Sequence, residues 1–234
     1  MVLKEHPLKL FIEKEAERIN SMERIICLLA GYLFGLIQTG YLYGKAHKID
    51  IRNHGSGNSG TTNALRVMGA KAGAVVFFGD FLKSLLPCLL VRVIFKDKPE
   101  MVYLLMMYTG LGVILGHNYP FYLKFKGGKG IAATAGLIVA TDLRMTLLCF
   151  VAFLSIVIIT RYVSLGSLVV AVILFTWLAA FATLGAYGID QGLLFEFYII
   201  TAMISGLAFW RHRANIGRLV RGTENKISLN FGKK

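Results

Sequence analysis

Long apolar stretches separated by short polar segments dominate the chain. No charged residue occurs in residues 25–44, 101–116, 145–160 or 162–189. A helix of about 20 apolar residues crosses the hydrocarbon core of a membrane, so the pattern predicts an all-α integral membrane protein with about seven transmembrane helices. We expect these helices near residues 25–45, 71–95, 101–116, 131–142, 145–160, 163–188 and 193–210. In the second of them Asp80 and Lys83 are three residues apart, so they face one side and can pair.

The first 24 residues have a different pattern from the rest of the chain. They carry five Lys/Arg and five Glu residues. Apolar residues recur among them at helical spacing, at Leu8, Phe11, Ile12, Ala16 and Ile19. We expect residues 1–24 to form an amphipathic or partly ordered N-terminal extension, ahead of a membrane domain at residues 25–234.

Composition agrees with a membrane protein. The chain is 56% hydrophobic, with a mean hydropathy of +0.61. Cys27, Cys88 and Cys149 lie in apolar stretches without metal-ligand spacing, so we expect packing residues and neither metal nor cofactor. The net charge of +13 fits both a positive-inside bias and a basic site for phosphate. Nucleic-acid binding is not expected, because the basic residues lie in short loops.

The basic residues also predict the orientation. With seven spans, the segments 46–70, 117–130 and 211–234 and the turn at Arg161 lie on one side of the membrane, and most Lys and Arg residues belong to them. The positive-inside rule places this side in the cytoplasm. We therefore expect a multi-pass protein of the cell inner membrane, with the N-terminus outside and the C-terminus cytoplasmic. The five basic residues of the N-terminal extension run against this orientation.

The first polar segment, 54-HGSGNSGTTNALR-66, combines glycines with many hydrogen-bond donors. Glycines allow successive backbone N–H groups to turn inward around an anion. A helix starting near Thr61 would add the positive potential of its N-terminus. The candidate ligand-binding residues are Ser56, Gly57, Asn58, Thr61, Thr62, Asn63 and Arg66. The alternative is a flexible loop of turn residues.

The second polar segment carries lysines in a glycine-rich loop, Lys126-Gly127-Gly128-Lys129-Gly130. A Walker A motif would need a glycine five residues before its Gly-Lys pair and a Ser or Thr after the pair, where this chain has Leu123 and Gly130. ATP binding is therefore not supported, whereas phosphate binding fits the loop. The alternative is a charged turn that anchors the following helix. The nearby His117 is expected to satisfy a helix end.

The third polar segment follows the last apolar stretch. His212 and Asn215 are three residues apart, so they share a helix face and both suit hydroxyl ligands. Glu224 can orient an arginine, and Ser164 belongs to the same side of the membrane. A basic flank of a membrane span remains the alternative. Because all three segments fall on one side, we expect one shared site for a polar, anionic ligand.

Together these motifs resemble the bacterial acyl-phosphate:glycerol-3-phosphate acyltransferases, the PlsY family. The resemblance rests on GSGNxGxTNxxR at residues 55–66, GHNxPxxLxFKGGKGxAxxxG at 116–136, WRHxxNIxRLxxGxE at 210–224 and GDFLK at 79–83. Ser59 and Thr61 depart from the aliphatic residue and the alanine that are usual there.

The resemblance implies an enzyme that moves a fatty acyl chain from acyl-phosphate to the 1-hydroxyl of sn-glycerol 3-phosphate. The products would be lysophosphatidic acid and inorganic phosphate. Ser56, Arg66 and Lys129 would bind phosphate groups, and His212 and Asn215 would hold the glycerol hydroxyls. The implied catalytic set is Arg66, Lys129, His212 and Asn215, and Ser164 corresponds to a family serine. The implied partners are glycerol 3-phosphate, a long-chain acyl-phosphate, membrane lipid and an upstream acyl-phosphate synthase.

Two questions stay open at this level. His212 either takes the proton of the acceptor hydroxyl or positions that hydroxyl while the substrate's own phosphate takes it. A membrane transporter of a small phosphorylated anion would also use glycines and broken helices. Transport is disfavoured because the polar segments fall on one side and no inverted repeat is visible. The HxxxxD signature of other glycerolipid acyltransferases is absent.

Overall fold

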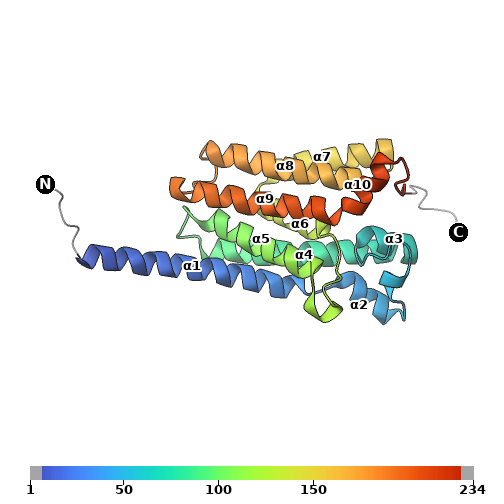
Figure 1. Ribbon diagram of the computed structural model, residues 1–234, viewed down its shortest axis with the longest axis horizontal. Coiled ribbons are helices and arrows are strands. Elements are labelled where there is room, and N and C mark those ends of the chain that lie inside the picture. The colour runs from blue at the N-terminus through green and yellow to red at the C-terminus, as the bar shows by residue number, and fades with distance from the viewer. Residues whose placement is uncertain (1–6, 228–234) are drawn as a thin grey trace.

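The computed structural model describes the backbone of residues 7–227 and the side chains of residues 21–227. This part of the chain folds into helices and loops without a strand, which confirms the all-α prediction. The long helices run side by side along the longest axis (Figure 1). The α-helices, short ones included, are α1 (Pro7–Gly35), α2 (Thr39–Ala46), α3 (Thr61–Met68), α4 (Ala70–Ile94), α5 (Val102–Asn118), α6 (Ile131–Thr141), α7 (Leu143–Thr160), α8 (Val163–Thr183), α9 (Leu194–Arg211) and α10 (Arg213–Val220).

The outer surface of the bundle is apolar, as lipid contact requires. In the described chain, five segments are long and apolar enough to cross a membrane: Ser21–Ala46, Ala70–Ile94, Leu143–Thr160, Val163–Thr183 and Gln191–Arg211. Helices α5 and α6 are shorter, at 17 and 11 residues. Large apolar side chains such as Ile26, Leu86 and Phe150 are exposed on the outside of the bundle. The number of spans, seven, remains a prediction.

Residue 25, where we expected the membrane domain to begin, lies inside a continuous helix. Helix α1 continues without a break from Pro7 into the first apolar stretch. The amphipathic face predicted for residues 1–24 falls mainly on residues 1–20, whose side chains lie outside the described part of the chain.

The prediction that residues 25–45 form a single helix is wrong. The helix ends at Gly35 and a new one begins at Thr39. The side chain of Gln38, which is fully buried, donates to the carbonyls of Gly35, Gly116 and His117 at 3.0–3.3 Å. Lys83 Nζ donates to the carbonyl of Ile37 at 2.6 Å. A transmembrane helix can break where donors of the protein hydrogen-bond to the carbonyls that the break leaves unpaired.

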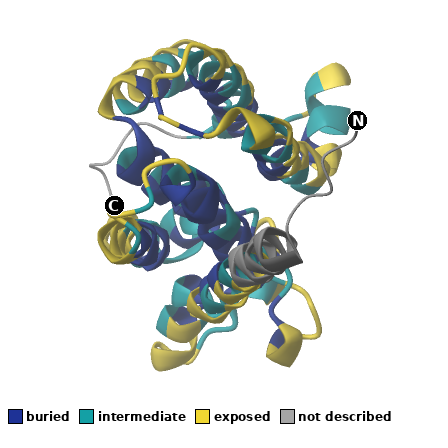
Figure 2. Cartoon of the chain, turned by 90° about the vertical axis from the view of Figure 1, so that its left-hand side faces the viewer, coloured by how far each residue is buried: buried dark blue, intermediate teal, exposed yellow. Residues whose placement is uncertain are grey.

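Helix α5 is the centre of the bundle and contacts α1, α4, α6 and α9. Figure 2 shows the buried residues concentrated on the inward faces of the helices. Helices α1 and α5 approach closely through paired glycines, Gly31 and Gly35 on α1 and Gly112 and Gly116 on α5. A Cβ atom at Gly112 would overlap the carbonyl oxygen of Leu28. Small residues spaced four apart are the usual means of bringing membrane helices into backbone contact.

We predict that Gly112→Ala destabilises the fold by about 1–3 kcal/mol, because the added methyl group meets backbone and not a movable side chain. The matched control is Gly206→Ala in α9, where an added Cβ would meet nothing within 4 Å. Thermal unfolding of the purified protein in detergent measures both variants. Equal unfolding temperatures for the two would contradict the close packing of α1 on α5.

Candidate active site

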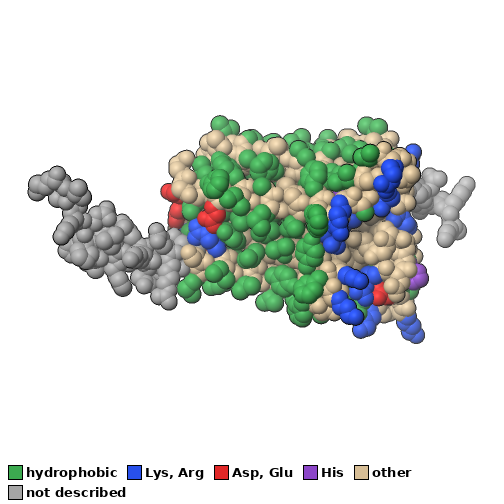
Figure 3. Space-filling model, in the orientation of Figure 1, with side chains coloured by type: hydrophobic (Ala, Val, Ile, Leu, Met, Phe, Trp, Pro, Cys, Tyr) green, Lys and Arg blue, Asp and Glu red, His purple; other side chains and the backbone are tan. Residues whose placement is uncertain are grey.

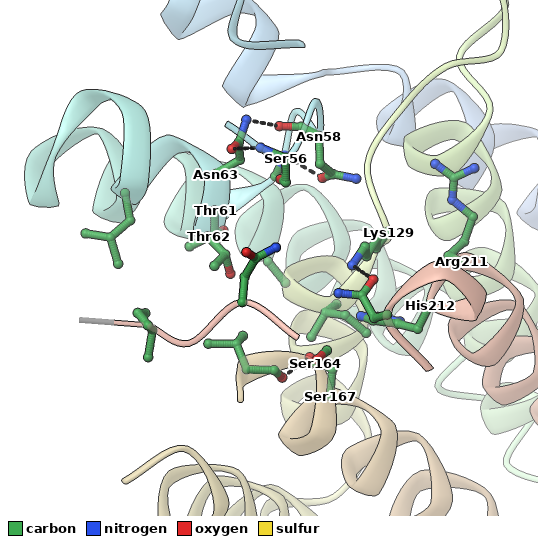
Figure 4. A pocket seen from close by; sticks show the side chains of 18 of the residues that line it. Ser56, Asn58, Thr61, Thr62, Asn63, Lys129, Ser164, Ser167, Arg211 and His212 are labelled. Carbon is green, nitrogen blue, oxygen red and sulfur yellow. Dashed lines mark hydrogen bonds between the residues drawn. The ribbon is translucent and has the colours of Figure 1, made fainter. Parts of the chain in front are cut away.

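The three polar segments, which we expected to share one site, line one cavity. The cavity has a volume of about 420 Å³ and lies at the end of the bundle that carries α3 and α10 (Figures 1 and 4). Its polar lining comes from all three segments, from the start of α8 and from Asp80 in α4. The sequence-predicted residues that line it are Ser56, Asn58, Thr61, Thr62, Asn63, Arg66, Lys129, Gly130, Ser164, His212, Asn215 and Glu224.

Asn63 holds the first segment in shape. Its side-chain oxygen accepts the backbone N–H of Ser56 at 2.8 Å, and its amide nitrogen donates to the carbonyls of Ile51, His54 and Asn58 at 2.9–3.1 Å (Figure 4). These bonds use the whole amide group, so Asn63 shapes the loop around a ligand. Asn58 accepts the N–H of Gly60 at 2.9 Å.

Thr61 stands at the start of α3 with a buried hydroxyl that has no hydrogen-bond partner. Buried polar atoms in folded proteins are nearly always paired, so an unpaired one beside a cavity indicates a place for a ligand oxygen. Arg66, in the last turn of α3, is exposed toward the cavity and forms no ion pair within the described chain. The segment therefore offers one positive charge and an unused hydroxyl.

The glycine loop, for which phosphate binding was expected, does not present all of its N–H groups to the cavity. The N–H groups of Gly127 and Gly128 donate to the carbonyls of Asn118 and His117 at 3.2 and 3.1 Å. These two glycines are therefore not N–H donors to a ligand, because α5 already uses their donors. A Cβ at Gly128 would overlap the His117 ring, so glycine is required for this close approach. The loop fixes the position of Lys129.

Gly57 and Lys126, also predicted as binding residues, do not line the main cavity. Both line a second, neighbouring cavity. The glycine-rich segments thus divide their residues between two adjoining spaces.

A chain of hydrogen bonds connects the second and third segments. Lys129 Nζ donates to Asn215 Oδ1 at 2.5 Å, and Asn215 Nδ2 donates to Glu224 Oε1 at 2.6 Å. Glu224 also accepts from Ser164 at 3.1 Å and pairs with Arg218 at 2.8 Å. Glu224 thus links α8 and α10 and, through Asn215, orients Lys129.

The cavity carries an excess of positive charge. Arg66, Lys129, Arg211 and Arg218 line it. Its two carboxylates are Glu224 and Asp80, and Asp80 is already paired with Lys83. Burial, with a contribution from the three arginines, lowers the pKa of Lys129 to about 8, and Glu224 opposes this change. An anionic ligand would relieve the repulsion among these cations.

His212 is neutral at physiological pH and presents one free nitrogen. Burial lowers the pKa of its imidazole to about 4, and the charge of Lys129 adds to the effect. The Nδ1 atom lies 2.7 Å from the carbonyl oxygen of Ala208, so Nδ1 carries the proton and donates it to that carbonyl. Nε2 is left as an acceptor, suited to a ligand hydroxyl.

Arg218 and Asp80 are cavity residues that the sequence analysis did not assign to the site. Arg218 lies three residues after Asn215 on α10, so the spacing that joined His212 to Asn215 could have identified it.

Asp80 and His117 belong to a buried cluster around Lys83. The predicted pairing of Asp80 with Lys83 is confirmed, at 2.8 Å, and Lys83 also donates to His117 Nδ1 at 2.8 Å.

We predict that Lys83→Met destabilises the protein by about 3–5 kcal/mol, because it leaves the buried Asp80 carboxylate without its partner. The double variant Asp80→Leu/Lys83→Met is expected to regain part of the loss, since no isolated charge remains. Unfolding temperatures of the single and double variants test this coupling. Additive losses would show that the two side chains act independently.

Part of the cavity lining, which we call the apolar wall, consists of apolar side chains. It combines side chains of five helices: Leu65, Phe77, Ile131, Phe153, Val157 and Val163. The site therefore joins a cationic, hydroxyl-rich end to a surface that suits a hydrocarbon chain.

Fold and site together define an integral membrane protein with a cationic cavity beside an apolar wall. The family model described as glycerol-3-phosphate acyltransferase matches residues 25–222. The chain belongs to this family and is an acyltransferase, which confirms the resemblance of its motifs. A glycerol-3-phosphate acyltransferase of Shouchella clausii is 43% identical over 206 residues, covering 87% of this chain and 95% of the relative. One of Thermoanaerobacter pseudethanolicus is 38% identical over 207 residues, covering 88% and 96%.

Solved structures agree with the family. The glycerol 3-phosphate form of PlsY (YgiH), an integral membrane glycerol 3-phosphate acyltransferase, is 35% identical with a TM-score of 0.75, covering 88% of this chain and 96% of that one. The lysophosphatidic acid form has a TM-score of 0.71 at the same identity, covering 88% and 95%.

Proposed function

We propose that this protein transfers a long-chain acyl group from acyl-phosphate to the 1-hydroxyl of glycerol 3-phosphate. The products are lysophosphatidic acid and inorganic phosphate. The observation that carries the proposal is the pairing, in one cavity, of four cations with an apolar wall. Such a cavity suits a donor with a phosphate head and a hydrocarbon tail, together with a phosphate-bearing acceptor.

The cations address the main obstacle to the reaction, which is the repulsion between two phosphate anions. Two unit charges 4 Å apart repel by about 4 kcal/mol at an effective dielectric constant of about 20. Arg66, on α3, approaches one side of the cavity, and Lys129 and Arg218 approach from the glycine loop and α10. Holding both reactants in contact then supplies most of the acceleration, because phosphate is already a good leaving group.

The proton of the acceptor hydroxyl goes to a substrate phosphate. The 1-oxygen of glycerol 3-phosphate attacks the carbonyl carbon, the bond from that carbon to the phosphate oxygen breaks, and phosphate leaves. His212 accepts a hydrogen bond from the hydroxyl through Nε2 and positions it. With a pKa of about 4, His212 is a weaker base than a phosphate group, whose second pKa is about 6.

Asn215 has a positioning role in this proposal. Its amide is occupied by Lys129 and Glu224, so it aligns the lysine with the donor phosphate. Ser56 and Thr61 supply hydroxyls from the first polar segment.

The site faces the cytoplasm of a bacterial inner membrane in this proposal, with the N-terminus outside. Lys and Arg side chains gather at the end of the molecule that carries α2, α3 and α10 (Figure 3). At the other end, Lys98 and Arg24 form ion pairs with Glu23 and Glu196. The positive-inside rule supports this orientation. An acyl-phosphate synthase would supply the donor from the same side.

Sealed vesicles containing the protein test the enzyme against transport. With acyl-phosphate and radiolabelled glycerol 3-phosphate outside, we expect the label to become extractable into organic solvent. Label that enters the vesicle lumen as unchanged glycerol 3-phosphate, without extractable product, would contradict the proposal and indicate a transporter.

A further inference from the structure

A second cavity lies beside the main one on the polar end of the molecule. Its volume is about 460 Å³, and it shares Ser56, Asn58 and Arg211 with the main cavity. The other charged residues that line it are Arg52 and Lys126, and its lining includes no carboxylate. Its one large apolar side chain is Phe125. This composition suits a small, water-soluble anion and not a hydrocarbon chain.

Arg52 is held in place before any ligand arrives. Its Nε and Nη2 atoms donate to Asp50 at 2.9 and 2.7 Å, and its guanidinium lies 4.7 Å from the centre of the Tyr41 ring. Asp50 is in turn fixed by the backbone N–H of Arg52 at 3.0 Å. Neither of these bonds uses Nη1, which can donate to another acceptor.

Arg211 is held in the same manner, between the two cavities. Its Nε donates to the carbonyl of Gly128 at 3.0 Å, and its Nη2 donates to the carbonyls of Gly127 and Gly128 at 2.9 and 2.8 Å. The guanidinium also lies 5.2 Å from the centre of the Tyr119 ring. The carbonyls of the glycine loop thus hold a cation at the boundary, again with Nη1 unused.

Lys126 completes the group from the outer side. It is exposed, and it has no ion pair within the described chain. Two fixed guanidinium groups and one lysine therefore surround a water-accessible space, and Asp50 balances one of the three charges. Arginines whose orientation is already fixed lose little entropy when they bind phosphate oxygens.

We propose that the second cavity is a vestibule for the phosphate group of the water-soluble species, either glycerol 3-phosphate entering or inorganic phosphate leaving. The inference rests on the proposed function, because it assigns these two molecules to the same site. Arg211 contributes to both cavities, so a phosphate group can pass from one to the other without losing contact with a cation. The membrane-bound donor does not need this route, since its apolar chain lies against the wall of the main cavity.

The test compares Lys126→Gln with Lys124→Gln. Lys124 is an exposed lysine of the same loop that lines neither cavity. We expect Lys126→Gln to raise the KM for glycerol 3-phosphate about three- to fivefold, with kcat and the KM for acyl-phosphate unchanged. Lys126→Arg should restore the wild-type KM, and Lys126→Glu should raise it further. Lys124→Gln should behave as wild type.

Product inhibition separates the two phosphate sources. If Lys126→Gln weakens inhibition by inorganic phosphate as well as raising the KM for glycerol 3-phosphate, the vestibule serves both. A change in one alone supports the vestibule and assigns it to that species. Unchanged values for both, or an equal effect of Lys124→Gln, would overturn the inference.

A binding measurement keeps this test independent of the proposed function. Equilibrium binding of radiolabelled inorganic phosphate to the detergent-solubilised protein should be weaker for Lys126→Gln than for wild type. If the wild type transfers no acyl group but this difference is seen, the proposed function fails and the vestibule stands. If transfer occurs and Lys126→Gln changes neither phosphate binding nor the KM for glycerol 3-phosphate, the vestibule fails alone.

Discussion

Replacing Lys129 by methionine is expected to lower kcat/KM for acyl transfer at least about 100-fold, or about 2.7 kcal/mol of transition-state stabilisation. The reason is position: Lys129 extends from the glycine loop into the cavity, is aligned by Asn215, and lies among arginines that serve the same anions. Steady-state kinetics on folded, purified protein measures the loss. Lys71→Met, at an exposed position near the start of α4, is the control and should keep wild-type activity.

The pH dependence of kcat/KM shows whether Lys129 acts through its positive charge or only through its shape. With the pKa of Lys129 at about 8, kcat/KM of the wild type should fall as the pH rises through about 8, because the lysine loses its proton. Arginine stays charged in this range, so any activity that Lys129→Arg retains should not show that fall. A wild-type profile that stays flat to pH 10 would contradict a charged Lys129 in the reaction.

Glu224→Gln is expected to move the same alkaline fall to lower pH. The carboxylate raises the pKa of Lys129, so its removal leaves the lysine among three arginines and lowers that pKa below about 8. Activity near pH 8 should therefore drop about tenfold or more, since Arg218 also loses its partner, and should recover in part toward pH 6.5. The measurement is kcat/KM from pH 6 to 9.

Ser164→Ala is the matched control for this variant. It removes one hydrogen bond from Glu224, at 3.1 Å, but no charge. The alkaline fall should stay at its wild-type pH in Ser164→Ala. If both variants shift it equally, the effect comes from the geometry of the network and not from the charge of Glu224.

Helix bounds were predicted well from the sequence where they follow the length of an apolar stretch. Each expected span lies over one helix except the first, which breaks after Gly35. The span expected at 163–188 is too long, because α8 ends at Thr183. That break depends on Gln38 and Lys83 reaching carbonyls across helices, and Lys83 is 46 residues from its acceptor, Ile37. Composition within residues 25–45 carries no sign of such distant partners, so the break could not be predicted from it.

The site was predictable in its members and less so in their roles. Loop chemistry and spacing located Arg66, Lys129 and His212 at one cavity. Phosphate binding was expected of the loop that contains Gly127 and Gly128, but the N–H groups of these two glycines donate to carbonyls of α5. A glycine that permits close packing and one that exposes its N–H look alike in sequence, because the difference lies in what approaches them.

The choice of acyl donor distinguishes an enzyme that uses acyl-phosphate from one that uses acyl-coenzyme A. Purified protein is given glycerol 3-phosphate with either acyl-phosphate or acyl-coenzyme A of the same chain length, and inorganic phosphate and lysophosphatidic acid are both quantified. The account predicts equal amounts of the two products from acyl-phosphate, lost in Lys129→Met, and no lysophosphatidic acid from the thioester. Efficient transfer from acyl-coenzyme A, or phosphate release without lysophosphatidic acid, would contradict it.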